Sequence, residues 1–248
     1  MSRVAVVVGG AGGIGRACVE DLRSRGWRVA TIDLVDSGDI NADFTVGGVD
    51  ASDPVALERA IAASVAALGR PEAWIYAAGI AEVTPIDALT VEAWQRLHGV
   101  NVDGQLHLAR AALSRRAEGP TTLIGVTSTA GLLARAEDEA YSATKAAATA
   151  LMRGIGGRYA TEDVLAVAVC PGPVDTPLLR GALDRCADRE AALRRLETAT
   201  AIGRLIAPSE IAELIGWICE RRPFVFAAAA LPADGGKSSV LPLHPDFP

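Results

Sequence analysis

Short, continuous apolar runs alternate with longer amphipathic segments from one end of the chain to the other. Continuous apolar runs are typical of strands that are buried on both faces of a sheet, and the segments between them repeat their apolar residues with helical spacing. The predicted strands are residues 4–8, 28–32, 46–49, 73–78, 121–127, 164–170 and 225–233. The predicted helices are residues 16–25, 54–68, 90–117 and 141–161, a charged segment within 178–206, and a last helix near Ser209. Because no repeat or Pro/Ser-rich linker interrupts the alternation, the pattern predicts one α/β domain, residues 1–248, with a doubly wound parallel sheet.

Two helix starts carry residues that favour capping. Asp53 stands directly before Pro54, which combines an N-cap acceptor with proline at the first helical position. Ser209 follows Pro208 and is the expected cap of the last helix.

The first predicted strand runs directly into a glycine-rich turn, Gly9-Gly10-Ala11-Gly12-Gly13-Ile14-Gly15, and a helix follows. Strand, glycine turn and helix form an arrangement that binds dinucleotides, because backbone N–H groups can approach a pyrophosphate at the positive end of the helix. A plain tight turn is the alternative meaning, but the position after an N-terminal strand favours the nucleotide site. The expected contacts are Gly9, Ala11, Gly12, Gly13, Ile14 and Gly15.

An acidic residue, Asp33, ends the second predicted strand, about 20 residues beyond the glycines. A carboxylate at that place can bind both hydroxyls of an adenosine ribose, and it would repel a 2′-phosphate. Neither Gly12 nor Leu34 provides a cation for such a phosphate, so the pattern predicts NAD rather than NADP. Further cofactor contacts are expected at Leu34, Asp50, Ala51, Ala78 and Gly79, with an ordinary turn acid as the alternative reading of Asp50.

Tyr141 and Lys145 are four residues apart in an Ala-rich segment that favours a helix, so the phenol and the ammonium lie on the same helical face. A fixed cation beside a phenol favours the phenolate, so we expect the pKa of Tyr141 to fall below its usual value of about 10. Of the 24 basic residues only two, Lys145 and Lys237, are lysine. A surface helix that happens to carry both residues is the alternative.

Composition narrows the function classes. Half of the residues are hydrophobic, which suffices for a sizeable core, and the formal charge of −6 without a basic block argues against nucleic acid as a partner. No apolar run has the length of a signal peptide or a membrane span. The cysteines and histidines show no ligand spacing, so we expect no metal, free buried thiols and a cytoplasmic protein.

In their order and spacing, these residues resemble the short-chain dehydrogenase/reductase family over nearly the whole chain. Each motif is short, but nine of them in the family's order, with Ser128 thirteen residues before Tyr141, are highly specific. The shared motifs are the glycine-rich turn, Asp33, Asp50, Ala78-Gly79, Asn101, Ser128, Tyr141-x-x-x-Lys145, Pro171-Gly172 with Thr176, and Asp234-Gly235-Gly236.

The resemblance implies a Rossmann-type fold and a catalytic tetrad of Asn101, Ser128, Tyr141 and Lys145. Tyr141 takes the alcohol proton while a hydride passes to the nicotinamide, and Ser128 holds the substrate oxygen. Lys145 lowers the pKa of Tyr141 and binds the nicotinamide ribose, and Asn101 holds a water that links Lys145 to solvent. The implied cofactor contacts also include Tyr141 and Lys145 themselves, and Pro171, Gly172, Val174 and Thr176.

Three positions depart from the family pattern. Val8 stands where the family usually has Thr, and Ala77 where it usually has Asn. Losing both partners of a buried hydrogen bond can be nearly neutral, so we expect a dry, packed substitute there. Ala228 stands where the last strand usually carries Gly, which is expected to affect strand packing or a subunit contact.

The leading hypothesis is an NAD-dependent oxidoreductase that acts on a secondary alcohol or its ketone. The alternatives are a cis-dihydrodiol or similar ring-diol dehydrogenase, then a 3-oxoacyl-carrier-protein reductase, which Asp33 disfavours, then a non-enzymatic NAD sensor.

Residues 177–206 are the expected substrate lid. Leu132, Leu133, Leu178 and Leu179 indicate an apolar part of the substrate site, whereas Arg135, Arg180 and Arg185 are expected to be solvated. The acidic stretch 137–139 argues against an anionic substrate.

The amphipathic helices at 90–117 and 141–162 resemble those that form subunit contacts in the family, so the expected assembly is a homotetramer, with a dimer next. The tail, residues 241–248, is apolar and Pro-rich, and it is expected to pack on a neighbouring subunit or to fray.

Overall fold

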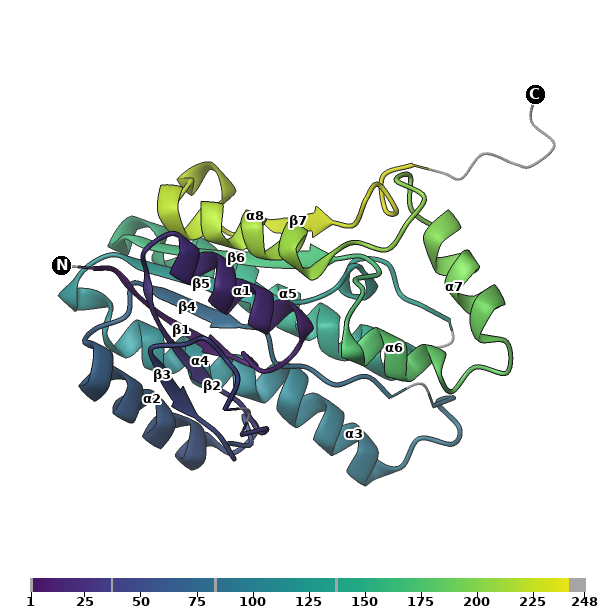
Figure 1. The fold of residues 1–248 in the computed structure, drawn as a ribbon, viewed down its shortest axis with the longest axis horizontal. Helices are drawn as coiled ribbons and strands as arrows, with labels where there is room; N and C mark the ends of the chain where they lie inside the picture. Colours follow the sequence, from purple (N-terminus) through teal and green to yellow (C-terminus); the bar gives the residue numbers. More distant parts are fainter. Residues whose placement is uncertain (1, 37, 83, 137, 241–248) are drawn as a thin grey trace.

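The computed structural model describes residues 2–36, 38–82, 84–136 and 138–240. Seven parallel strands form one sheet in the order β3-β2-β1-β4-β5-β6-β7 (Figure 1). The doubly wound parallel sheet predicted from the apolar runs is confirmed. The strands are β1 Val4–Val8, β2 Arg28–Ile32, β3 Phe44–Val46, β4 Ala73–Tyr76, β5 Thr121–Val126, β6 Val164–Pro171 and β7 Ala230–Ala233.

Helices cover both faces of the sheet. The main helices are α1 Gly13–Ser24, α2 Pro54–Leu68, α3 Val91–His98, α4 Gly104–Ser114, α5 Glu139–Tyr159, α6 Pro177–Leu183, α7 Arg189–Thr198 and α8 Pro208–Arg221. Strand β1 shows why its apolar run is continuous: Val4, Val6 and Val8 enter the core beneath α2, α4 and α5, while Ala5 and Val7 enter the core beneath α1 and α8. Each side chain of the strand is thus buried on one face or the other.

The helix predicted over 90–117 is interrupted. A π-helical turn, Gly99–Asp103, separates α3 from α4, and a short 3-10 turn, Arg116–Glu118, follows α4. The buried Tyr76 donates its hydroxyl hydrogen bond to the carbonyl of Val100 inside this turn. Gly104 makes room for that phenol, since a Cβ there would overlap the Tyr76 hydroxyl. The interruption therefore depends on a strand that is distant in sequence.

Three smaller predictions are wrong. The third strand is Phe44–Val46 rather than residues 46–49. The last strand begins at Ala230 rather than at residue 225, because Phe224–Phe226 form a 3-10 turn and Ala228 has a left-handed φ of 62°. Ser209 is not the cap of α8: Ala207 is the N-cap residue, and Glu210 accepts a hydrogen bond from its N–H at 2.8 Å. The predicted cap of α2 is confirmed, since Asp53 accepts from the N–H groups of Val55 and Ala56.

Across the ranges that the structure describes, every helix is too short or too polar to cross a bilayer.

Candidate active site

Most of the predicted cofactor residues, together with Ser128, follow the carboxyl ends of β1, β2, β4, β5 and β6. Because these strands are parallel and neighbouring, their carboxyl ends lie at one edge of the sheet, the edge at which doubly wound folds bind ligands. The turns after β1 and β4 also touch directly. Gly9 has a φ of 85°, and a Cβ at Gly9 would overlap the backbone of Ala78.

The glycine-rich turn and Asp33 form one unit. Asp33 accepts hydrogen bonds from the N–H groups of Ala11, at 2.8 Å, and Val35, at 3.0 Å. Gly12 is exposed at the N-terminus of α1, where first-turn N–H groups have no partner within the helix. An exposed helix N-terminus with a carboxylate at the end of the next strand fits the pyrophosphate and ribose of a dinucleotide. Ile14 and Gly15 complete this turn at the start of α1.

The adenine-side residues lie on neighbouring loops. Leu34 is 66% exposed directly after β2, and Ala51 is buried. One carboxylate oxygen of Asp50, Oδ1, accepts from both the N–H and the hydroxyl of Ser52, at 2.9 and 2.7 Å. Asp50 therefore forms an acid-capped turn, the alternative that the sequence left open, and its other oxygen remains for a ligand.

The segment after β6 closes the opposite side of the edge. Pro171 ends β6, and the next residue, Gly172, is packed so closely on Asp234 that a Cβ would lie 2.9 Å from it. Val174 and Thr176 are buried, and the Thr176 hydroxyl accepts from the N–H of Leu179 at the start of α6. Thr176 also contacts the glycine-rich turn, because a Cβ at Gly13 would overlap its side chain. The two sequence-distant cofactor segments thus meet.

Tyr141 and Lys145 lie one turn apart on α5. The Lys145 Nζ atom is 5.7 Å from the centroid of the Tyr141 ring, and it donates to the carbonyl of Val126, at the end of β5, at 3.4 Å. Lys145 is buried, and Gly79 lies against it, since a Cβ there would stand 3.1 Å from Nζ. The spacing predicted from the sequence therefore brings a buried ammonium to the face of the phenol.

In the protein without a cofactor, the pKa of Tyr141 is raised, not lowered as expected. Burial raises the pKa of Tyr141 to about 12, and the negative charge of Asp138 adds to that rise. A hydrogen bond with the Ser128 side chain and the positive charge of Arg135 act in the opposite direction. Burial also lowers the pKa of Lys145 to about 8. The prediction was wrong because it considered the positive charge of Lys145 but not the burial of the two side chains. Burial favours the neutral form of each group.

Ser128 directs its side chain from the end of β5. It caps the 3-10 turn Thr129–Gly131, accepting from the N–H of Ala130 at 3.1 Å, and its side chain lowers the pKa of Tyr141. Gly131 is necessarily glycine here, because a Cβ would lie 2.6 Å from the backbone of Lys145. The turn thus fixes Ser128 against the start of α5.

Asn101 is buried inside the π turn, and its amide is fully engaged with the protein. Its Oδ1 atom accepts from the N–H of Ile80, and its Nδ2 atom donates to the Ile80 carbonyl, both at 3.0 Å. Nδ2 also donates to the Thr144 hydroxyl at 3.1 Å. Asn101 therefore joins the loop after β4 to α5, beside Lys145, and the bridging water that the resemblance implies stays a prediction.

Sequence reasoning missed Ile80, Thr144 and Tyr76, which hold Asn101 and its turn. Thr144 stands three residues after Tyr141, on the same turn of α5 as Tyr141 and Lys145, and that spacing was an available signal. Ile80 acts through backbone atoms and Tyr76 through a tertiary contact, so neither left a signal in the local pattern.

The positions Val8 and Ala77, which depart from the family pattern, are joined through the backbone. The N–H of Ala77 donates to the carbonyl of Val8 at 2.8 Å, and Val8 is 1% exposed within the core. The two side chains belong to different core clusters, Val8 to the one beneath α2, α4 and α5 and Ala77 to the one beneath α1 and α8, so the expected dry substitute stays a prediction.

On the substrate side of the sheet edge lie exposed apolar side chains and two arginines. One arginine is closely paired with a carboxylate and the other is not. Leu132, Leu133 and Leu178 are 37%, 58% and 44% exposed. The guanidinium of Arg180 is held by both oxygens of Asp175, at 2.7 and 2.8 Å. Arg135 meets the buried Asp138 only at 3.7 Å. Glu137, the first residue of the acidic stretch 137–139, lies outside the described residues, as does the tail 241–248.

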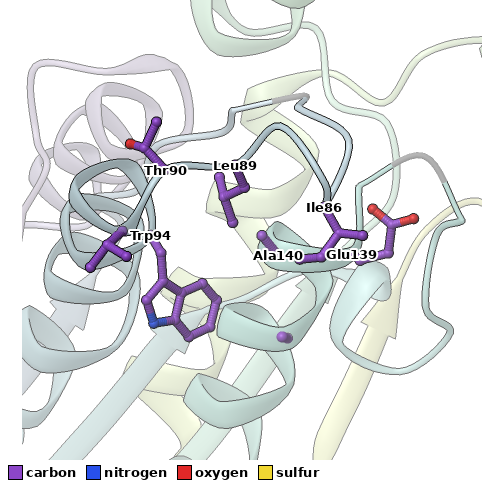
Figure 2. Close-up of a pocket in the computed structure, with 8 residues that line it drawn as sticks. Ile86, Leu89, Thr90, Trp94, Glu139 and Ala140 are labelled. Atoms are coloured by element: carbon purple, nitrogen blue, oxygen red, sulfur yellow. The ribbon is translucent and has the colours of Figure 1, made fainter.

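An apolar pocket of about 440 Å³ opens between the start of α3 and the start of α5 (Figure 2). Leu89 and Trp94 wall it on one side and Ala140 on the other. A second cavity, of about 510 Å³, lies beside Ile206 and the turn after β7. The residues recorded along these two cavities include no member of the tetrad, so neither cavity marks the reacting atoms.

Comparison with known proteins places the chain in a family. The family model described as Enoyl-(Acyl carrier protein) reductase matches residues 9–238. A cis-4-hydroxycyclohexanecarboxylate dehydrogenase of Sinomonas cyclohexanicum is 32% identical, over 96% of this chain and 97% of its own. A 2-dehydro-3-deoxy-L-rhamnonate dehydrogenase (NAD(+)) of a Sphingomonas species is 27% identical, over 96% of each chain.

A solved structure supports the fold. The ligand-free aldohexose dehydrogenase of Thermoplasma acidophilum superposes with a TM-score of 0.91 at 23% identity, over 99% of this chain and 98% of its own. The full-length family match and the shared sheet agree with the motif order found in the sequence. The chain therefore belongs to the short-chain dehydrogenase/reductase family, whose members are oxidoreductases that use a nicotinamide cofactor.

Proposed function

We propose that this protein is an NAD-dependent oxidoreductase that transfers a hydride between a secondary alcohol, or its ketone, and the nicotinamide. The observation that carries the proposal is the placement of Tyr141, whose pKa the Ser128 side chain lowers and whose ring is flanked by the buried ammonium of Lys145. This group lies at the same sheet edge as the glycine-rich turn that is bonded to Asp33. A proton donor and a dinucleotide site at one edge suit carbinol chemistry.

When bound, NAD supplies the hydride acceptor. Ser128 orients the substrate oxygen, and Tyr141 exchanges the proton at that oxygen as general acid or base. With its pKa raised to about 12, the Tyr141 phenol keeps its proton at neutral pH and is ready to protonate the oxygen of a ketone. Alcohol oxidation requires the phenolate, which the nearby positive charge of Lys145 favours.

NAD is proposed rather than NADP because of the charges around the expected position of the adenosine ribose. Asp33 places a carboxylate at the end of β2, linked to the glycine-rich turn, where it would repel a 2′-phosphate. The nearby cation, Arg16, is engaged by both oxygens of Asp39 at 3.0 Å, which neutralises the charge that a phosphate would need. Both features favour the unphosphorylated cofactor.

A ring alcohol is the substrate shape with the most support. The Sinomonas relative is named for a hydroxycyclohexanecarboxylate, and the exposed leucines around the site offer an apolar surface to a ring. A ring-diol dehydrogenase remains the close alternative, a 3-oxoacyl-carrier-protein reductase is less favoured because of Asp33, and an NAD sensor would lack turnover. Residues 177–206, which contain α6 and α7, would act as the substrate lid.

We further propose a homotetramer, with a dimer as the second choice, in a cytoplasmic setting. Family membership supports self-association, and the interrupted helix 90–117 and α5 are the surfaces proposed to form it.

The proposed function is tested with cyclohexanol, cis-4-hydroxycyclohexanecarboxylate and its carboxamide, each assayed with NAD and with NADP. We expect turnover of at least one alcohol and a preference for NAD of about 100-fold in kcat/KM, which is the order expected when a charged group is placed against a phosphate. Asp33→Asn should reduce that preference at least ten-fold, whereas Asp36→Asn, an exposed control on the same loop, should leave it unchanged. A preference for NADP contradicts the cofactor assignment, and no turnover of any alcohol with either cofactor favours the sensor.

A further inference from the structure

The buried side chain of Thr144 joins two members of the tetrad. Thr144 stands on α5 between Tyr141 and Lys145, and it is 0% exposed. Its hydroxyl donates to the carbonyl of Tyr141 at 2.8 Å and accepts from the Nδ2 atom of Asn101 at 3.1 Å. A helical threonine can bond the carbonyl three or four residues earlier, so the helix itself holds this hydroxyl. Thr144 therefore reaches Asn101 from a fixed position.

The Thr144 hydroxyl presents only an acceptor to Asn101. A hydroxyl has one proton, and the Tyr141 carbonyl receives the proton of this one. The lone pairs that remain can bond only to the NH2 end of an amide. The backbone of Ile80 supports the same orientation, because its N–H donates to Oδ1 of Asn101 and its carbonyl accepts from Nδ2, both at 3.0 Å. Three hydrogen bonds thus assign the two ends of the amide, and a half-turn of the amide would break all three.

The amide oxygen that this orientation selects lies beside the ammonium of Lys145. A Cβ on Gly79 would stand 3.1 Å from Nζ of Lys145 and 3.3 Å from Oδ1 of Asn101, so both atoms border a space that one methyl group would fill. Oδ1 uses one of its two lone pairs on Ile80, and Nζ uses one of its three protons on the Val126 carbonyl. The negative end of a dipole beside a buried ammonium favours the charged form of the lysine.

Burial makes this orientation costly to lose. Asn101 is 1% exposed, so its amide cannot exchange protein partners for bulk water. Without the Thr144 hydroxyl, one Nδ2 proton either stays unpaired or turns the amide away from its position. A turned amide would bring an NH2 group toward the Lys145 ammonium, whose pKa burial already lowers to about 8. The positive charge next to Tyr141 therefore depends on which end of Asn101 faces it.

We propose that Thr144 is a positioning residue of the tetrad: its hydroxyl holds the Asn101 amide so that the oxygen, and not the NH2 group, borders the Lys145 ammonium. The inference rests on the proposed function and adds a residue to the machinery of that site. Thr144 acts through Asn101, and its contribution to the reaction is the electrostatic environment of Lys145 and Tyr141.

The kinetic test uses Thr144→Val, which replaces the hydroxyl with a methyl group of similar size. The kcat for the preferred alcohol with NAD should fall about ten-fold, while KM stays within about two-fold of wild type, because the change affects positioning and leaves substrate binding intact. Thr144→Ser keeps the hydroxyl and should retain kcat within about two-fold of wild type.

Thr149→Val is the matched control. Thr149 is also buried on α5, and its hydroxyl donates to the carbonyl of Lys145 at 2.8 Å. Both valine variants lose the same kind of bond to the helix backbone, so we expect similar decreases in the temperature of thermal unfolding. Thr149→Val should nevertheless keep wild-type kcat. Equal losses of kcat in the two valine variants would overturn the proposal.

A double-mutant cycle tests whether Thr144 acts through Asn101. In an Asn101→Ala background, Thr144→Val should change kcat by less than about two-fold, compared with about ten-fold in wild type. The same loss in both backgrounds would show that Thr144 acts independently of Asn101 and would contradict the proposal.

Nitrogen-15 NMR tests the orientation of Asn101 without any turnover. The chain has two asparagines, Asn41 and Asn101, so protein labelled with 15N-asparagine shows only two side-chain NH2 groups. Asn41 is exposed and serves as the internal reference. The NH2 protons of Asn101 should exchange with water at least ten-fold more slowly than those of Asn41. Thr144→Val should remove this protection from at least one of them, and Thr149→Val should leave both protected.

The NMR result separates this inference from the proposed reaction. If no alcohol is turned over but the expected exchange pattern is found, the proposed reaction fails and the positioning of Asn101 by Thr144 stands. Asn101 protons that exchange as fast as those of Asn41 in wild type, or that keep their protection in Thr144→Val, would rule out the positioning role.

Discussion

Tyr141 and Lys145 show how burial and charge compete at single residues. Their positions were predicted from a four-residue spacing, but the protonation states depend on what covers them. Burial raises the pKa of Tyr141 to about 12 and lowers that of Lys145 to about 8, so each group is shifted toward its neutral form, although Lys145 stays mostly protonated at neutral pH. Solvent exclusion is set by tertiary packing, which is why the local pattern could give the position of the pair and not its titration.

Asp138 is a buried carboxyl one turn before Tyr141, and one of its oxygens, Oδ1, has no partner among the described residues. Burial raises the pKa of Asp138 from 3.8 to about 6, against the charge of Arg135. A carboxyl with a raised folded-state pKa binds its proton more tightly when folded. The protonated carboxyl therefore contributes its full stabilisation of the folded protein below about pH 4. This contribution to the free energy of unfolding, about 3 kcal/mol or less, is lost as the pH rises through 6.

Asp138→Asn should abolish this pH dependence. Relative to the variant, wild type should lose on the order of 2 kcal/mol of unfolding free energy between pH 4.5 and 7.5, measured by urea unfolding at a series of pH values. Asp87→Asn, at an exposed position, serves as the control. A wild-type-to-variant difference that stays constant across this pH range would show that Asp138 does not titrate as described.

At the scale of elements, local sequence explains the strands and most helices, and tertiary partners explain the exceptions. The apolar run of β1 and the Asp53-Pro54 start of α2 are local signals, and both elements form as predicted. The π turn Gly99–Asp103 is held by Tyr76 and by the backbone of Ile80, which are distant in sequence. A periodicity of apolar residues cannot report such partners, so the break in the helix was not predictable from it.

The turn before β7 holds the clearest backbone strain. Ala228 has a φ of 62°, a left-handed conformation that costs a residue with a Cβ about 1–2 kcal/mol, and Gly156 packs against its backbone. The family usually has glycine at this position, and the structure supplies a conformational reason for that preference. The presence of Ala228 instead of glycine thus affects the backbone conformation of the turn before β7. This effect is more specific than the expected change in strand packing.

Ala228→Gly should stabilise the protein by about 0.5–1 kcal/mol, since the relief of strain exceeds the added flexibility of the unfolded chain. The neighbouring Ala229→Gly change, at a residue without a left-handed φ, should destabilise by a similar amount. Thermal and urea unfolding of the two variants measure the difference. Equal destabilisation by both substitutions would mean that Ala228 is not strained.

At the scale of the whole molecule, the parallel sheet explains why residues as distant as Gly9, Ser128 and Gly172 share one site. Each follows the carboxyl end of a strand, and the strand order brings those ends together at one edge. Sequence order alone therefore allowed the site to be predicted once the strands were recognised. The substrate side was harder to predict, because the exposed Leu132, Leu133 and Leu178 come from segments that are far apart in the sequence.

Replacement of Tyr141 by Phe tests the central claim most directly, because it removes one hydroxyl and keeps the ring. Turnover of the preferred alcohol with NAD should fall by about 10²–10⁴ in kcat, as expected for loss of a general acid–base group, while the Kd for NAD stays within about two-fold of wild type. Tyr159→Phe, the same change at the end of α5, should keep wild-type turnover. A Tyr141→Phe enzyme that retains kcat within ten-fold of wild type would contradict the assignment of Tyr141 as the proton-transfer residue.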